Sequence, residues 1–141
     1  MAKEIAIVRT VATLRRTVAA WRKKGQTVAM VPTMGALHAG HLSLVEMARQ
    51  RCDRVVVSIF VNPAQFSPTE DFDRYPRDEA GDVAKLATAK ADLVWAPERR
   101  EMYPDGFVTR VGVGGVAEGL DGRFRPHFFG GVATVVSKLL L

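Results

Sequence analysis

The stretch from residue 28 to residue 48 constrains the fold most, because its pattern changes from that of a strand to that of a helix. Val28–Val31 is an apolar run typical of a buried parallel strand. Pro32 has no backbone N–H to donate, so we expect the strand to end there. Gly35 falls in the turn that follows, where it permits a backbone conformation or a close approach that a side chain would block. From Gly40 onward a helix is predicted, because apolar residues recur at helical spacing, at Leu42, Leu44, Val45 and Ala48.

A second buried strand follows this helix, which we expect to run to about Arg51. Arg54–Val61 is a continuous run rich in β-branched residues, as in strands covered on both faces. A strand, a helix and a strand at this spacing form a βαβ unit with a right-handed crossover. Shorter apolar runs at Ile5–Val8 and Leu93–Ala96 are further candidate strands. The pattern predicts an α/β fold, with a parallel sheet flanked by helices, in one domain over residues 1–141.

Two more helices are predicted from capping residues and periodicity. An amphipathic helix is expected from an N-cap at Thr10 to a stop at Gly25. A second helix is expected over Asp78–Lys90. Asp82 lies in its first turn, where a carboxylate suits the helix dipole; a role in binding magnesium is the weaker alternative.

The remaining segments have less regular patterns. Residues 69–77 are polar with two aromatics and are expected to form a loop that could fold over a site. Residues 98–106 are predicted to be a loop, and residues 118–131 to be irregular. Phe107–Val113 alternates like an edge strand, whereas residues 131–141 suit either an apolar helix or a strand. Such an apolar end indicates either docking onto this domain or continuation into a longer protein.

His38 and His41 are the candidate chemical groups of the turn after the first buried strand. They are three residues apart, so in helical geometry they point the same way. Free N–H groups and the dipole at a helix N-terminus favour bound phosphate. Two imidazoles there can donate hydrogen bonds to oxygens that gain charge in phosphoryl or nucleotidyl transfer, and Gly40 would let a nucleotide approach the backbone. The alternative is a pair of surface histidines at a helix start.

A protein-held metal site is not expected. The chain has 3 histidines and 1 cysteine, and the third histidine and the cysteine are not at ligand spacing from the pair.

Amide side chains follow the second buried strand. Asn62-Pro63 is a turn signal, and Gln65 lies shortly after it. Ligands of open α/β sheets bind outside the carboxyl ends of the strands, so both amides are expected on the same edge as the histidines. Amides can bind hydroxyls and carboxylates without adding charge. Turn capping is the alternative, favoured for Asn62 and about as good as ligand binding for Gln65.

Composition excludes several classes of protein. A hydrophobic content of 48% and a charged content of 25% are ordinary for a soluble globular protein. No apolar run reaches the roughly 18 residues of a membrane span, and the N-terminus lacks the apolar core of a signal peptide. The net charge is +5, but the basic residues are scattered without interleaved aromatics, so no nucleic-acid partner is expected. Cys52 alone cannot form an internal disulfide, which suits a reducing cytoplasm.

Five sequence blocks together resemble one known family. They are Pro-Thr-Met-Gly-Ala-Leu-His-Ala-Gly-His at 32–41, Ser-Ile-Phe-Val-Asn-Pro-Ala-Gln-Phe at 58–66, Asp-Phe-Asp-Arg-Tyr-Pro-Arg at 71–77, Met-Tyr-Pro-Asp-Gly at 102–106 and Gly-Val-Ala-Thr-Val-Val at 131–136. The chain is identified by them as similar to the pantothenate synthetase (pantoate–β-alanine ligase) family of HIGH-motif nucleotidyltransferases. The resemblance implies the Rossmann-like N-terminal domain of that family, a cytoplasmic location and a homodimer.

The resemblance also implies a two-step reaction with Mg²⁺ and ATP. Pantoate attacks the α-phosphorus of ATP to give pantoyl adenylate and pyrophosphate, and β-alanine then gives pantothenate and AMP. By match to the family motifs, His38 and His41 are catalytic and contact ATP phosphates, with His41 in the proton-donor position. The implied ATP site comprises Met34, Gly35, Ala36, Leu37, His38, Ala39, Gly40 and His41. Gln65 matches the glutamine that holds pantoate, and the other implied substrate-site residues are Pro32, Asn62 and Tyr75.

The chain differs from the family pattern in two places. Phe128 occupies the family's histidine position, and His127 is one place early and could rebuild the contact. Family members also continue with Gly-Glu-Lys-Asp and Met-Ser-Ser-Arg segments and a small C-terminal lid domain, none of which is within residues 1–141. One alternative is therefore a truncated, inactive or non-catalytic module of the same lineage that dimerises or binds. Another is a phosphopantetheine adenylyltransferase, against which the Asn-Pro-Ala-Gln-Phe block argues.

Overall fold

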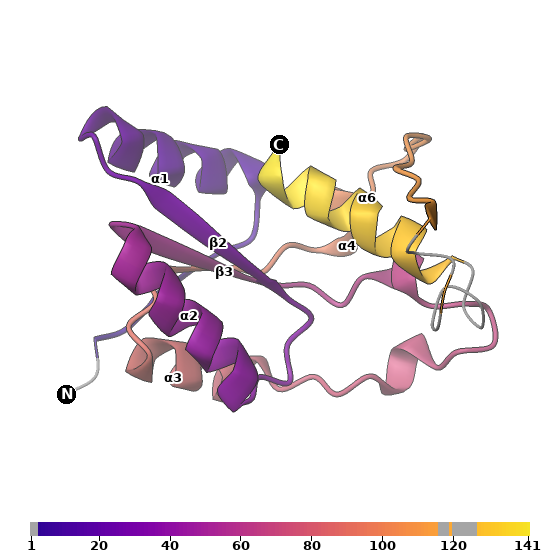
Figure 1. Ribbon diagram of the computed structural model, residues 1–141, viewed down its shortest axis with the longest axis horizontal. Helices are drawn as coiled ribbons and strands as arrows, with labels where there is room; N and C mark the ends of the chain where they lie inside the picture. Colours follow the sequence, from indigo (N-terminus) through magenta and orange to yellow (C-terminus); the bar gives the residue numbers. More distant parts are fainter. Residues whose placement is uncertain (1–2, 116–118, 120–126) are drawn as a thin grey trace.

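The computed structural model describes residues 3–115, 119 and 127–141, and these form an α/β fold around a four-stranded parallel sheet. The strand order is β1-β4-β3-β2, where the strands are β1 (Ala6–Val8), β2 (Val28–Thr33), β3 (Arg54–Ile59) and β4 (Leu93–Trp95). The helices are α1 (Val11–Lys23), α2 (Ala39–Arg51), α3 (Glu79–Thr88), α4 (Arg99–Met102) and α6 (Phe128–Leu140), with short 3-10 turns η1 (Pro63–Gln65) and η2 (Phe72–Arg74). Figure 1 shows α1 and α6 on one side of the sheet and α2 and α3 on the other. The predicted parallel sheet with flanking helices is confirmed.

The two faces of β3 supply the two halves of the core. Val55 and Val57 are buried among side chains of α2 and α3. Val56, one residue out of phase, is buried on the opposite face with Trp95 of β4 and Val135 of α6. Since strand side chains alternate between faces, a continuous β-branched run is what a strand covered on both sides requires.

Local capping explains where two of the helices begin. Thr10 caps α1 by accepting a hydrogen bond from Thr13 N at 3.2 Å, and Gly25 takes a φ of 74° just beyond the end of that helix, as predicted. Asp78 caps α3 by accepting from Gly81 N at 3.0 Å. The predicted helix over 78–90 is confirmed, with slightly shorter bounds.

The prediction that the first buried strand ends at Pro32 is wrong by one residue. Pro32 lies within β2, opposite Ser58 of β3, and β2 continues to Thr33. The physical reason is that β2 is the edge strand of the described sheet, and proline, which lacks an N–H, is tolerated at an edge. Thr33 then closes the strand end with a hydrogen bond from its Oγ1 to Ser58 O at 2.7 Å.

The predicted edge strand at Phe107–Val113 is also wrong, because none of these residues lies in a strand. Val111 N donates to the hydroxyl of Thr134 on α6 at 3.0 Å, so this backbone is bonded to a helix side chain instead of a sheet edge. The predicted loop at 98–106 contains a short helix, α4. Most of the predicted irregular segment 118–131 lies outside the described residues.

The C-terminal segment, for which helix and strand were both open, is the helix α6. Thr134 and Val135 are buried on the sheet side, whereas Leu140 is 66% exposed. No helix in the described part of the chain is long and apolar enough to cross a membrane.

Near the start of α6, Gly131 lies directly on the η1 turn, where an added Cβ would be 2.6 Å from the Ala64 carbonyl carbon and 2.9 Å from Gln65 N. The glycine therefore permits α6 to pack against the loop that carries Gln65.

We predict that Gly131→Ala destabilises the fold, although alanine is the better helix former. The added methyl meets backbone atoms that cannot rotate away, so α6 must shift, at a cost of about 1–3 kcal/mol. Urea unfolding followed by circular dichroism measures the change. Gly112→Ala is the matched control, because nothing lies within 4 Å of an added Cβ there. Equal stability of the two variants would contradict the proposed contact.

Candidate functional site

The turn between β2 and α2 has an unusual backbone held by side chains from another element. Gly35 has a φ of 83° and Ala36 a φ of 51°, so two successive residues are in the left-handed region. For alanine this conformation costs about 1–2 kcal/mol. Asp82 on α3 accepts hydrogen bonds from Ala36 N at 3.0 Å and Leu37 N at 2.9 Å, and Lys85 Nζ donates to Leu37 O at 2.9 Å.

His38 and His41 form a reciprocal cap at the start of α2. Gly40 N donates to His38 Nδ1 at 3.1 Å, and His38 N donates to His41 Nδ1 at 3.2 Å. The ring centroids are 4.0 Å apart. Since a neutral imidazole has one acceptor nitrogen and one donor nitrogen, acceptance at Nδ1 assigns the proton to Nε2 in both rings. The cap thus fixes the tautomer and leaves two Nε2–H donors at a helix N-terminus.

The electrostatics favour neutral His41. Partial burial lowers the pKa of His41 below its usual value of 6.5, and the neighbouring His38 lowers it further, while the carboxylate of Asp82 acts in the opposite direction. His41 is therefore uncharged at pH 7, the state in which Nδ1 accepts and Nε2 donates. Such a donor can stabilise a negatively charged oxygen without proton transfer.

Gly40 has a structural role in addition to the one predicted. That its missing side chain lets a nucleotide approach the backbone stays a prediction. A Cβ on Gly40 would lie 2.8 Å from His38 Cε1 and 3.0 Å from His38 Nδ1. The space beside Gly40 is therefore filled by the His38 ring, and the glycine keeps that ring in its capping position.

The amide pair lies on the neighbouring strand end. β2 and β3 are parallel neighbours, so Asn62 and Gln65, which follow β3, are at the same edge of the sheet as the histidines, as predicted. Asn62 is completely buried and has four hydrogen bonds. Its Oδ1 accepts from Ala64 N at 3.2 Å and from Tyr103 Oη at 2.6 Å; its Nδ2 donates to Gln65 Oε1 at 2.9 Å and to Gly131 O at 3.1 Å.

These bonds confirm the turn-capping interpretation of Asn62. The residue joins η1, the α4 region and α6, and it orients the carboxamide of Gln65. Burial raises the pKa of the Tyr103 hydroxyl, against smaller opposite effects of Arg110 and Asn62, so Tyr103 remains a neutral donor to Asn62.

No described contact joins the other predicted substrate-site residues to the histidines. Tyr75 packs edge-on against Phe66, the residue after Gln65, with centroids 5.9 Å apart. Phe72 also packs on the Phe66 ring, with ring centroids 5.3 Å apart. The 69–77 loop is therefore held by aromatic contacts to the amide loop, the segment 62–66 that carries Asn62 and Gln65. Pro32 is exposed on β2. His127 lies at the N-cap of α6 and makes no capping bond with its side chain.

The described residues contain no group of three or more histidine, cysteine or acidic side chains able to hold a metal ion.

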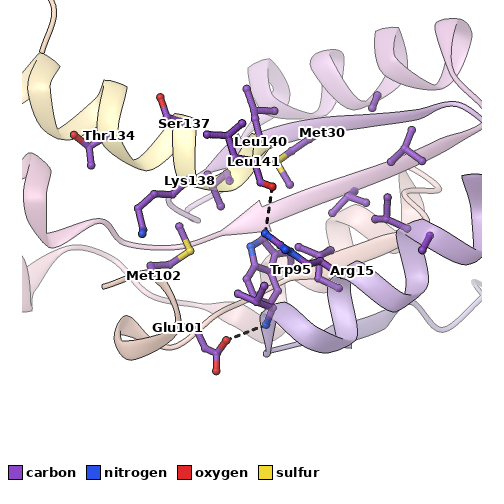
Figure 2. Close-up of a pocket in the computed structure, with 18 of the residues that line it drawn as sticks. Arg15, Met30, Trp95, Glu101, Met102, Thr134, Ser137, Lys138, Leu140 and Leu141 are labelled. Atoms are coloured by element: carbon purple, nitrogen blue, oxygen red, sulfur yellow. Dashed lines mark hydrogen bonds between the residues drawn. The ribbon is translucent and has the colours of Figure 1, made fainter. Parts of the chain in front are cut away.

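A sizeable groove lies elsewhere, on the opposite face of the sheet from α2 and α3. It is a groove of about 1120 Å³ between α1 and α6, floored by side chains that include Met30 and Trp95. Figure 2 shows Arg15 reaching from α1 to the backbone oxygen of Leu141 at the end of α6, a bond of 3.2 Å. The groove is mainly apolar, and its lining does not include His38 or His41. We therefore take the histidine turn, residues 34–41, as the candidate chemical site, and not this groove.

Sequence reasoning missed the supporting residues Asp82, Lys85 and Tyr103. Asp82 was correctly predicted in the first turn of its helix, but nothing in the local pattern indicates that it binds a turn 45 residues away in sequence. Tyr103 belongs to the Met-Tyr-Pro-Asp-Gly block at 102–106 that resembles the family. That block was the signal that could have identified Tyr103 as a supporting residue.

Comparison with known proteins finds relatives from one family. The family model described as pantoate-beta-alanine ligase matches residues 6–141. Pantothenate synthetase of Rhodopseudomonas palustris is 60% identical over 136 residues, covering 96% of this chain and 48% of the relative. That of Caulobacter vibrioides is 61% identical over 135 residues, covering 96% and 47%.

Solved structures give the same picture. A crystal structure of pantothenate synthetase from Thermus thermophilus has a TM-score of 0.88 and 52% identity, covering 96% of this chain and 48% of the other. A pantoate-beta-alanine ligase from Francisella tularensis, complexed with beta-gamma ATP and beta-alanine, has a TM-score of 0.89 and 39% identity, covering 96% and 52%. The chain spans about half the length of the curated relatives it matches. Over that span, this chain belongs to the pantoate–β-alanine ligase family.

Proposed function

We propose that this chain is the nucleotide-binding half of an enzyme that condenses pantoate with β-alanine at the expense of ATP. In the first step a pantoate carboxylate oxygen attacks the α-phosphorus, forming pantoyl adenylate and releasing pyrophosphate. In the second step the amine of β-alanine attacks the acyl carbon, and AMP leaves with the bonding electron pair. The observation that carries the proposal is the pair of Nε2–H donors at the N-terminus of α2.

The turn and the first residues of α2, from Met34 to His41, would bind the phosphates of ATP. Backbone N–H groups and the helix dipole attract the anion, and His38 and His41 donate to its oxygens. As pyrophosphate leaves, negative charge grows on the bridging oxygen, and a donor fixed beforehand stabilises it without reorganisation. We assign the leaving-group interaction to His41, which is the more buried of the two histidines.

Gln65 would bind pantoate, because a carboxamide held by Asn62 presents a fixed polar group beside the phosphate site. Pro32, Asn62 and Tyr75 would complete this side of the pocket, with Asn62 acting through Gln65. Magnesium would enter with ATP as part of the substrate. We further propose a homodimer in the cytoplasm, with no nucleic-acid or membrane partner.

A second candidate is a non-catalytic module of the same lineage that dimerises or binds. The apolar groove between α1 and α6, with Leu140 and Leu141 66% and 90% exposed beside it, favours this alternative. The family match to the Asn-Pro-Ala-Gln-Phe block and the histidine turn favours the ligase over other nucleotidyltransferases.

We predict that pantoate-dependent exchange of pyrophosphate into ATP by the purified chain is slow, and that His41→Ala lowers its rate about tenfold or more. Loss of a hydrogen bond to a charged group costs roughly 1.5–3 kcal/mol, which sets this scale. Arg51→Ala, at the far end of α2, is the control for truncating a side chain of the same helix away from the turn. Absence of exchange in a folded wild-type chain would mean that the first step needs residues outside this span, and would favour the binding module as the description of this chain alone.

We predict that Gly40→Ala lowers the same exchange rate while leaving stability nearly unchanged. The added methyl displaces only the His38 ring, a side chain that can rotate, so the cost falls on the orientation of the donor and not on the core. Exchange assays and thermal unfolding of the same preparation separate the two effects. Exchange at the wild-type rate would mean that the ring position is unimportant.

We predict that His41 titrates below pH 6.5 and that His38→Ala raises the pKa of His41, because the substitution removes the electrostatic effect of the neighbouring imidazole that lowers it. A lowered folded-state pKa stabilises the fold above the unfolded value of about 6.5, and this contribution is lost as the pH falls through the folded-state pKa. Imidazole chemical shifts in a ¹⁵N-detected titration give both pKa values and the tautomer. A midpoint above 6.5 for wild-type His41 would contradict the assignment.

A further inference from the structure

The histidine turn has contacts from α3 that the proposed reaction does not use. Asp82 is only 2% exposed, although it is a charged residue on a surface helix. Both of its carboxylate oxygens are bonded to the turn: Oδ2 accepts from Ala36 N and Oδ1 from Leu37 N. Lys85, one helical turn later, donates to Leu37 O. Leu37 is thus held on both its N–H and its C=O by the same helix.

The residues that Asp82 holds are those with the least favourable backbone. Ala36 has a φ of 51°, a conformation that a non-glycine residue keeps only where other contacts enforce it. Gly35 precedes it with a φ of 83°, and a Cβ there would lie 3.1 Å from Asp82 Oδ2. The turn and the carboxylate are therefore packed at close range, and glycine is required at 35 for both conformation and space.

The direction of the turn determines where α2 begins. Leu37 is immediately followed by His38, the N-cap residue, whose backbone N–H is the donor to His41 Nδ1. If residues 36 and 37 relax from their present conformation, that N–H changes direction and the reciprocal cap is lost. The tautomer and separation of the two imidazoles thus depend on the backbone that Asp82 holds.

We propose that Asp82, assisted by Lys85, is a positioning residue that fixes the two histidine donors for phosphate by clamping the backbone of residues 36 and 37. The role in orienting phosphate donors rests on the proposed function, whereas the clamp itself is independent of it. Asp82 makes no described hydrogen bond with the imidazole nitrogens and acts through the backbone of the turn.

The test uses Asp82→Asn in the 141-residue chain. Asparagine offers one carbonyl oxygen without charge, so at most part of the clamp survives. We expect amide hydrogen exchange at Ala36 or Leu37 to accelerate roughly tenfold or more, and the ¹⁵N shifts of His38 and His41 to move toward a mixture of tautomers. We expect the KM for ATP in pyrophosphate exchange to rise and the chain to remain folded.

Asp78→Asn is the matched control. It removes the same charge from the same end of α3 and alters a carboxylate that caps the helix at Gly81. If Asp82 only stabilised α3, both variants would show the same changes. The clamp predicts that Asp78→Asn leaves the turn amides and the histidine tautomers as in the wild type.

Lys85→Met is the second variant, used if Asp82→Asn does not fold. It removes the donor to Leu37 O, keeps most of the aliphatic stem, and is expected to give smaller changes in the same direction. Wild-type amide exchange and tautomers in every folded clamp variant, or equal effects from Asp78→Asn, would overturn the proposal. Failure of pantoate-dependent exchange in the wild type would count against activity of this chain alone and not against the clamp, because the amide and ¹⁵N measurements require no activity.

Discussion

The parallel pairing of β2 with β3 positions everything at the candidate site. Its register runs from Val28 opposite Arg54 to Thr33 opposite Ile59, so the two strands end side by side. The histidine turn leaves one strand and the amide loop leaves the other. The two faces of β3 pack against different helices, so a slip of one residue would exchange the side chains that each layer of helices contacts. The relative position of the histidine turn and the amide loop is therefore set by the core.

Around this pairing, each half of the site is held by a buried polar side chain. Asp82, from α3, holds the histidine turn, and Asn62, within the amide loop, holds that loop. In both cases the group proposed to carry the chemistry is less buried than the group that orients it. The candidate site thus has buried supporting side chains, Asp82 and Asn62, that are as polar as the less buried side chains they orient.

Local sequence patterns were sufficient for the four strands, for α1, α2 and α3, and for the placement of the histidine pair, because each is determined by residues close together in the chain. They left α6 open between helix and strand and missed the short helix α4. They failed where the partner is distant. Phe107–Val113 alternates correctly for a strand, yet its backbone is bonded to Thr134 on a helix, and alternation does not specify a partner. Pro32 was expected to end a strand, but its tolerance depends on lying at the sheet edge, which only the strand order reveals. Asp82 was recognisable as a helix-start residue and not as a clamp for the same reason.

The hydrogen bond from Asn62 to Gly131 also has a consequence for the order in which the site forms. It spans 69 residues, whereas the bonds from Asp82 to the turn span 45 and 46. Contacts that close longer loops form later on average, since more chain entropy must be lost first. During synthesis the histidine turn can be completed once α3 has emerged. The amide loop lacks its contact with Gly131 until α6 docks. The contacts that hold the histidine turn can thus be complete before those that hold the amide loop.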